Sequence, residues 1–288
     1  MSVLLATLCL NEMEWLPRLY RQHKDWPELA QWVFVEAADR VYAEANPGTV
    51  NGAGLSTDGT SEFLEQLTSR DSRVVYIKHG FSEDPDPAKG KIAARQRYLE
   101  VAGQVAPQFV IGLDADEFYT REDQGRLIEV MRGEPSYHCF TFPKREIWRP
   151  PSLAQEPLLR YEAVGGFWGI PCCHWWRWSR GLYYQDCHNI PCHRKGWHLN
   201  DRIGQLHNDL SKPQMLHLGF ASERVATRLA KNRYYAERGE AADPQRSWYV
   251  ESRAAWEKWR PGERLPRGAR IALYDGPVPE IFCEGNRD

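Results

Sequence analysis

The fold is decided by the stretch Phe109-Val110-Ile111-Gly112-Leu113-Asp114-Ala115-Asp116-Glu117. Its first five residues form a short apolar run, which is typical of a buried β-strand. The run ends in three carboxylates within four residues, a change that marks the point where a strand leaves the core. Apolar runs at residues 3–10, 32–35 and 73–77 precede it. The acidic end therefore belongs to the last of four predicted strands.

Segments with helical or loop character separate these strands. Helices are predicted at residues 12–23 and 92–102, and a third follows Ser61, a plausible helix cap. Residues 46–59 and 85–90 are rich in Gly, Pro and small polar residues and are predicted loops. This alternation predicts an α/β fold, a mainly parallel sheet with helices on both faces. Such sheets bind ligands beyond the carboxyl ends of their strands.

The second half of the chain has a different character. Residues 137–220 are dense in aromatics, histidines and prolines, which favours short strands and long loops. Residues 222–238 and 247–259 are predicted helices. We therefore expect one domain over residues 1–220, with halves 1–118 and 119–220, and a C-terminal helical extension over residues 221–288.

Composition is that of a soluble globular protein. The chain has 288 residues, 42% hydrophobic and 26% charged, and no apolar run approaches the length of a membrane span. The apolar start lacks a basic leader and runs directly into Asn11 and Glu12, so a first strand explains it better than a signal peptide. The seven cysteines are then expected to be reduced thiols. These features favour a cytoplasmic protein.

The net charge of −2 hides an uneven distribution. Residues 172–270 hold 18 Lys and Arg against 10 Asp and Glu, an excess of +8. One interpretation is ordinary scatter of surface charge. The other is a basic face for an anionic acceptor such as nucleic acid or lipid phosphate. The overall pI of about 6.5 argues against general coating of nucleic acid.

The carboxylates after the fourth strand are a candidate metal site. Asp114 and Asp116 lie two residues apart, with Glu117 beside them. Carboxylate oxygens suit Mg²⁺ or Mn²⁺, which also takes phosphate oxygens from a substrate. A metal that bridges a diphosphate makes the nucleotide a better leaving group. The alternative interpretation is a polar turn that caps the next helix.

Five pieces in order resemble glycosyltransferases of the GT-A fold, in particular family-2-like enzymes. They are Thr7-Leu8-Cys9-Leu10-Asn11-Glu12, Val33-Phe34-Val35-Glu36, Ser56-Thr57-Asp58-Gly59-Thr60, Gly90-Lys91-Ile92-Ala93-Ala94-Arg95-Gln96 and Leu113-Asp114-Ala115-Asp116-Glu117. The resemblance covers roughly residues 3–118. It implies a metal-dependent enzyme that transfers a sugar from a nucleotide sugar, with a UDP-sugar as the expected donor.

The resemblance also implies roles for single residues. The backbone from Thr7 and Leu8 onward would pack beside the nucleotide base, and Glu36 would accept a hydrogen bond from uracil. The family more often has Asp there, followed directly by Gly-Ser-Thr-Asp-Gly-Thr, whereas about twenty residues intervene here before Ser56. Asp39 is therefore the fallback for this contact.

Two basic residues are the candidates for diphosphate binding. Lys91 and Arg95 are one helical turn apart, so both can face the same phosphates. Arg suits bidentate phosphate contact, and Lys acts as a point charge. A solvated basic helix face is the alternative for Lys91.

Later residues would complete the enzyme. His217 is similar to a late histidine that completes the metal site in many GT-A enzymes; the alternative is a core histidine with a satisfied hydrogen bond. Trp176-Arg177-Trp178 before Cys187-His188-Asn189 resembles an aromatic strand before a His-Glu pair, with Asn in place of Glu. His188 and the adjacent Asp186 are then the catalytic candidates, with Asp186 as the base that deprotonates the acceptor. An exposed carboxylate without a role is the alternative for Asp186.

Cysteines and histidines crowd the same stretch and allow a rival hypothesis. Candidate ligands of a structural Zn²⁺ are Cys173, Cys187, Cys192 and His193, although their spacing is irregular. The rival protein is a zinc-containing nucleic-acid adaptor without catalysis, which leaves the ordered N-terminal motifs unexplained. Five of the twelve tryptophans lie at residues 168–197, mostly as packing residues, with one or two able to stack on a sugar or base.

The acceptor stays open between two classes. A glycan or lipid-linked saccharide is the commonest acceptor of the resembled family. A hydroxymethylated base in DNA fits the basic, aromatic second half, and a base in a duplex would have to be flipped out to react. Neither the donor sugar nor the oligomeric state can be predicted from the residues.

Overall fold

The computed structural model describes residues 2–84, 86–141, 144–147, 159–162, 175–184, 191, 203–205, 213, 215–218, 270–273, 276 and 278–282. Its centre is a seven-stranded sheet in the order β10-β6-β9-β4-β1-β2-β3. The strands are β1 (Val3–Cys9), β2 (Leu29–Ala38), β3 (Val74–Phe81), β4 (Phe109–Gly112), β6 (Cys139–Thr141), β9 (Trp175–Arg177) and β10 (Ile203–Gln205). The four N-terminal strands are mutually parallel, and β9 runs antiparallel to β4 and β6. The α/β fold with a mainly parallel sheet is confirmed.

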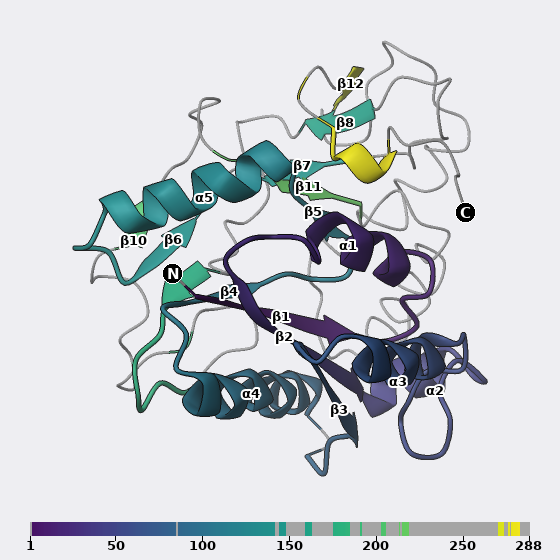
Figure 1. The fold of residues 1–288 in the computed structure, drawn as a ribbon. Helices are drawn as coiled ribbons and strands as arrows, with labels where there is room; N and C mark the ends of the chain where they lie inside the picture. The colour runs from purple at the N-terminus through teal and green to yellow at the C-terminus, as the bar shows by residue number, and fades with distance from the viewer. Residues whose placement is uncertain are drawn as a thin grey trace.

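Alternation along the strands divides the core into two layers. Val3 and Leu5 of β1 pack in one cluster with α1 (Leu16–His23), α3 (Thr60–Arg70) and α5 (Arg121–Gly133). Leu4 and Ala6 pack on the other face with α4 (Pro87–Val105). Figure 1 shows α1 and α5 on one side of the sheet and α4 on the other. Neighbouring strand residues point to opposite faces, so each face of the sheet has apolar side chains that helices cover. The predicted helices on both faces are therefore present.

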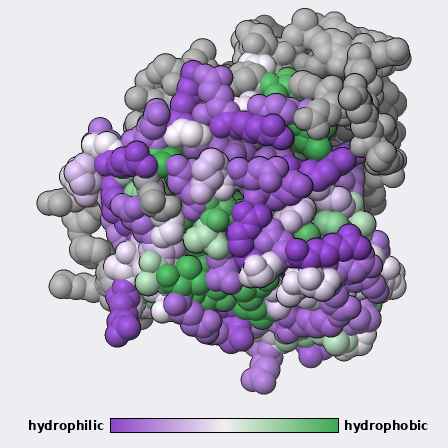
Figure 2. Space-filling model, viewed as in Figure 1, coloured by the Kyte–Doolittle hydropathy of each residue, from purple (hydrophilic) through white to green (hydrophobic). Residues whose placement is uncertain are grey.

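Hydrophobic side chains from the α4 side of the core reach the surface of the molecule. The face drawn in Figure 2 is mostly hydrophilic, with hydrophobic residues gathered above α4. Partly buried residues that pack against this layer include Leu8, Ile92 and Val105. Among the described residues, no helix combines the length and the apolar character needed to span a membrane.

Several element boundaries differ from the sequence-based expectation. The helix predicted at residues 12–23 begins at Leu16, and α2 (Arg40–Ala45) and α5 were not predicted. Residues 87–90 belong to α4 and not to a loop, because Pro87 occupies the first helical turn and Asp86 caps it by accepting from Ala88 N at 2.9 Å. Ser61 is not the cap of α3: Gly59 holds that position, and Ser61 lies inside the helix.

Two small sheets lie beside the main one. The first has the order β5-β11-β7 and consists of β5 (Glu117–Phe118), β11 (Met215–His217) and β7 (Lys144–Glu146). The second pairs β8 (Leu159–Glu162) with β12 (Arg270–Leu273), and a short 3-10 helix, η2 (Glu280–Phe282), packs near α1. Strands from residues 119–220 thus pair with strands of the first half. The domain limits at 118 and 220 stay a prediction, and the helices predicted at residues 222–238 and 247–259 lie outside the described residues.

Candidate functional site

The sheet has a switch point between β1 and β4. β1 pairs with β2 on one side and with β4 on the other, so the connections that leave β1 and β4 diverge. In open α/β sheets, ligands bind outside the carboxyl ends of the strands at such a point. Two loops start here, at residues 10–13 after β1 and at residues 113–116 between β4 and β5. We call residues 113–117 the acidic turn. The acidic stretch quoted from the sequence therefore lies at this edge of the sheet.

The acidic turn is closed by its own residues. Leu113 N donates to Ala6 O at 2.9 Å, which ties the turn to β1. Glu117 N donates to Asp114 O at 3.0 Å, and Asp114 N donates to the Glu117 carboxylate at 2.9 Å. Glu117 is 1% exposed, whereas the side chain of Asp114 is 37% exposed. Glu117 thus stabilises the turn, and the side chain of Asp114 stays partly exposed at its edge.

Asp116 and His217 come together although about a hundred residues separate them. β11 runs antiparallel to β5 with His217 opposite Glu117, and Leu218 N donates to Asp116 O at 2.8 Å. This pairing places His217 Nε2 3.6 Å from Asp116 Oδ1. Both side chains are largely buried, at 12% and 6% exposure. A carboxylate oxygen and an imidazole nitrogen therefore face one another at the end of the acidic turn.

Arg95 lies on the opposite side of the turn. It projects from α4, is 5% exposed, and places Nη2 3.7 Å from Asp114 Oδ1. Tyr98 and Tyr184 are buried nearby, and burial raises the pKa of both phenols, so they stay neutral. Lys91, one turn earlier, is half-buried. Arg95 is thus a buried guanidinium beside the acidic turn.

Asp116 and His217 offer a carboxylate oxygen and an imidazole nitrogen, which are ligand types that a divalent metal ion can accept. Two ligand atoms of an octahedral Mg²⁺ or Mn²⁺ are about 3 Å apart, close to the Asp116–His217 separation. Within the described part of the chain, no group of three Asp, Glu, His or Cys side chains is gathered at metal-binding spacing. Such ions are commonly held by one or two carboxylates plus waters and phosphate oxygens. Asp116 and His217, with Asp114 within the same turn, are therefore the residues that would hold the metal.

The loops after β1 and before α3 are fastened together. Asn11 N donates to Ser56 Oγ at 2.8 Å, Glu12 N to Thr60 Oγ1 at 2.7 Å, and Met13 N to Asp58 Oδ2 at 3.1 Å. The side chains of the motif at residues 56–60 thus bind the backbone of residues 11–13. The sequence pattern singled out this motif as one piece of the family resemblance, without this role. The signal was its run of short polar side chains, which commonly bond to nearby backbone.

Glu36 is engaged in the same region. It is 0% exposed, and its carboxylate accepts from Ser56 N at 2.6 Å, from Ser61 Oγ at 2.9 Å and from the Tyr76 hydroxyl. Burial and this carboxylate raise the pKa of Tyr76. Glu36 therefore fastens the loop at residues 46–59 to the sheet. The contact of Glu36 with a base stays a prediction, and it would require the carboxylate to exchange one of these bonds.

Three further residues were predicted to lie beside the base of the nucleotide sugar: Thr7, Leu8 and Asp39. Thr7 is buried and its Oγ1 accepts from Trp32 Nε1 at 3.0 Å, so only the main chain of Thr7 can meet a ligand. Leu8 is half-buried on the α4 side of the sheet. Asp39, the fallback for Glu36, caps α2 by accepting from Tyr42 N at 2.5 Å. These three residues surround the carboxyl ends of β1 and β2.

Several predictions fall outside the described residues. They are the catalytic candidates Asp186 and His188 and the proposed zinc ligands Cys173, Cys187, Cys192 and His193. Trp175 and Trp176 are described, and both are buried in the core at 0% and 1% exposure. The prediction that most tryptophans are packing residues is confirmed for these two.

No protein-family model and no curated protein matches the chain. Among solved structures, it is similar to S. aureus TarS 1-349, at 12% identity and a TM-score of 0.41 over 89% of this chain and 72% of that one. The complex of TarS 1-349 with UDP-GlcNAc gives 12% identity and a TM-score of 0.42 over the same shares. A CMP:2-keto-3-deoxy-manno-octonic acid synthetase complexed with CTP gives 12% identity and a TM-score of 0.32, over 57% and 59% of the two chains. Because these likenesses are distant, the functional argument rests on this chain's own residues.

Proposed function

We propose that this chain is a glycosyltransferase that uses a nucleotide sugar and a divalent metal ion, with the donor diphosphate bound at the acidic turn after β4. The observation that carries the proposal is the convergence at the switch point. Asp116 lies 3.6 Å from His217, and Asp114 lies 3.7 Å from Arg95. Ligand atoms for Mn²⁺ or Mg²⁺ and a cation for phosphate are thus placed within one turn of chain.

Each side chain has a separate task in this proposal. Asp116 and His217 hold the metal, and Asp114 is open to it and to the diphosphate. Arg95 binds a phosphate oxygen from a fixed position, and Lys91 adds positive charge one helical turn away. When bound, the metal neutralises charge that develops on the leaving diphosphate. Glu117 keeps the turn closed through its bond to Asp114 N.

The remaining parts of the reaction follow from the motif resemblance. A UDP-sugar is the expected donor, with its base beside the main chain that follows Thr7 and Leu8 and near Glu36. Asp186 or His188 would deprotonate the acceptor hydroxyl. A glycan or lipid-linked saccharide is the first acceptor to screen, and a hydroxymethylated base in DNA is the second.

The proposal is tested by unfolding temperatures with a panel of nucleotide sugars, each with and without Mn²⁺. A donor at a hundred times its dissociation constant stabilises the native state by about 2.7 kcal/mol. We expect this shift for one donor, only with Mn²⁺, and lost in Asp116→Asn. The matched control is Asp25→Asn, the same chemical change at an exposed residue between α1 and β2, on the opposite edge of the sheet.

The outcome against the proposal is equally definite. If no donor shifts the wild type, or if Asp116→Asn and Asp25→Asn respond alike, the acidic turn is not a donor site. For the donor that shifts, release of its nucleoside diphosphate is then measured with each acceptor class. Release that requires Mn²⁺ and an acceptor identifies the transfer reaction.

A further inference from the structure

The acidic turn is supported from behind by a segment remote in sequence. Gln22 of α1 donates from Nε2 to Tyr119 O at 3.0 Å and to the Glu280 carboxylate at 2.6 Å. Its Oε1 accepts from Ile281 N at 3.0 Å. One buried amide, 3% exposed, therefore bonds to the residue after β5 and to two adjacent residues of η2. Figure 1 shows η2 lying next to α1 and to the small sheet of β5 and β11.

The same segment reaches the start of α5. Arg121 N donates to the two oxygens of the Glu280 carboxylate at 3.2 and 3.3 Å. A carboxylate at this place satisfies an unbonded amide of the first helical turn and complements the helix dipole. Residues 119–121, which leave the acidic turn, are thus held at Tyr119 O and at Arg121 N by contacts to Gln22 and Glu280.

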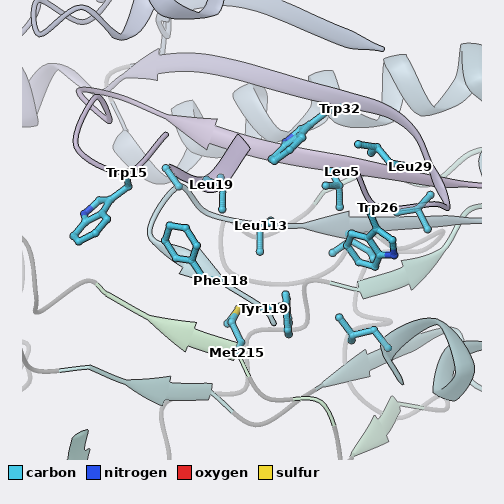
Figure 3. Close-up of a cluster of buried hydrophobic side chains, with 14 of the residues drawn as sticks. Leu5, Trp15, Leu19, Trp26, Leu29, Trp32, Leu113, Phe118, Tyr119 and Met215 are labelled. Atoms are coloured by element: carbon cyan, nitrogen blue, oxygen red, sulfur yellow. The ribbon is translucent and has the colours of Figure 1, made fainter. Parts of the chain in front are cut away.

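Aromatic rings continue this support up to β5. Phe282 packs edge-on against Phe118, with ring centroids 4.9 Å apart, and both contact Trp15 at 6.4 and 6.2 Å. Figure 3 shows Trp15 and Phe118 together, with Met215 of β11 beside them. Phe118 directly follows Glu117 and pairs with Leu216 of β11. Displacement of Phe282 therefore acts on the strand that aligns Asp116 with His217.

We propose that Gln22 and residues 278–282 form a clasp that positions the acidic turn against β11. The two-residue strand β5 has only a short ladder to β11, so its own pairing gives weak control over where Asp116 lies. The clasp fixes the chain at three points: at Phe118 within β5, and at Tyr119 and Arg121 directly after β5. Gln22 and Phe282 act on Asp116 through Tyr119, Glu280 and Phe118, so they are positioning residues. Groups that bond directly to metal ligands contribute about tenfold or more to metal affinity, and we expect the clasp, which acts one step further out, to contribute about tenfold.

The test uses the full chain with Gln22→Met, which keeps the length of the side chain and removes its three hydrogen bonds. Tyr20→Phe is the matched control, because it removes one side-chain bond of the same helix, from Tyr20 to Asp71 at 2.9 Å. Amide hydrogen exchange is followed by mass spectrometry in peptides that cover residues 114–120, 215–218 and 278–282. Phe282→Leu tests the aromatic contact and serves if Gln22→Met does not fold.

We expect Gln22→Met to speed exchange at residues 114–120 and 215–218, and Tyr20→Phe to leave both unchanged. Faster exchange confined to residues 278–282 overturns the clasp, because the acidic turn then holds without it. Free Mn²⁺ is measured in the same samples by electron paramagnetic resonance, with an expected affinity loss of about tenfold in Gln22→Met. The metal readout rests on the proposed function. If the wild type binds no Mn²⁺, that function loses its metal, while the exchange data still decide the clasp.

Discussion

His23 is a buried histidine whose protonation the fold opposes. It is the last residue of α1 and is 0% exposed. The rings of Trp26, Trp32, Phe118 and Tyr119 surround it, with centroids 6.2 to 6.5 Å away. Its Nδ1 lies 2.7 Å from Gln124 Nε2, an amide nitrogen that can only donate. Nδ1 is therefore the acceptor, and the imidazole is neutral with its proton on Nε2.

This environment makes stability depend on pH. Burial lowers the pKa of His23 to about 3 from its ordinary value of 6.5. As pH falls below 6.5, the unfolded chain binds a proton that the native state refuses until pH is near 3. The free energy of unfolding therefore falls over this window and is fully retained above it. At pH 5 the loss is about 2 kcal/mol relative to pH 8, since each pH unit below 6.5 costs about 1.4 kcal/mol.

The assay compares urea unfolding of the wild type and His23→Asn at pH 8 and pH 5. The Asn side-chain oxygen can accept from Gln124 in place of Nδ1, and it does not titrate. The smaller side chain lowers stability by the same amount at both pH values. Other acidic groups contribute equally in both proteins, so the difference between the two pH responses isolates His23.

We expect the wild type to lose about 2 kcal/mol more than His23→Asn between pH 8 and pH 5. Parallel pH dependence of the two proteins would refute the reasoning, because it would mean that the native state accommodates the imidazolium. A response of opposite sign would mean that a native carboxylate stabilises the charged ring.

Two further predictions concern the support of the site. Gly80→Ala should lower the free energy of unfolding by about 3 kcal/mol, because φ is +67° and a Cβ would lie 2.2 Å from Ala53 O. Gly48→Ala, with φ +81° and no atom near the new Cβ, should lower it by about 1 kcal/mol, and urea unfolding of both variants measures the difference. Arg177→Lys should cost about 2 kcal/mol, because the guanidinium donates to backbone carbonyls at the end of α5 and stacks over Phe109 at 4.8 Å, and an ammonium cannot replace both contacts; equal unfolding midpoints for the variant and the wild type would contradict this.

Strands β1, β2 and β4 could be predicted because their apolar runs are nearly continuous, as burial on both faces requires. Helix starts were harder. Pro87 was interpreted as part of a loop, although Asp86 before it makes it a first-turn proline. α5 was missed, although Thr120 caps it through Asp123 N at 2.9 Å, and Leu127, Ile128 and Met131 have helical spacing. In both cases the information was local and lay in the cap.

The site divides in the same way between local and remote information. Arg95 could be proposed from the short motif at residues 90–96, and Asp114 and Asp116 from the short motif at residues 113–117. His217 was proposed from its similarity to a late histidine of GT-A enzymes and from its position, since no local pattern relates it to Asp116. The bond from Gln22 to Glu280 joins residues 258 positions apart and involves two common side chains. Contacts of this kind depend on the packing of α1 and η2, which no single-sequence pattern encodes.

The arrangement of charge in the acidic turn bears on how metal and donor would bind. Three carboxylates within four residues repel one another unless each has a partner. Glu117 bonds to a backbone amide, Asp114 lies near Arg95, and Asp116 lies near His217. A diphosphate would add negative charge beside Asp114, and the one positive charge of Arg95 there does not neutralise two phosphates, so donor binding without a divalent ion is expected to be weak. By thermodynamic reciprocity, the donor must raise metal affinity by the same factor that the metal raises donor affinity. In the proposed enzyme, the turn is therefore expected to bind Mn²⁺ more tightly with a donor present than alone, and a donor that leaves the Mn²⁺ affinity unchanged would contradict shared binding at this turn.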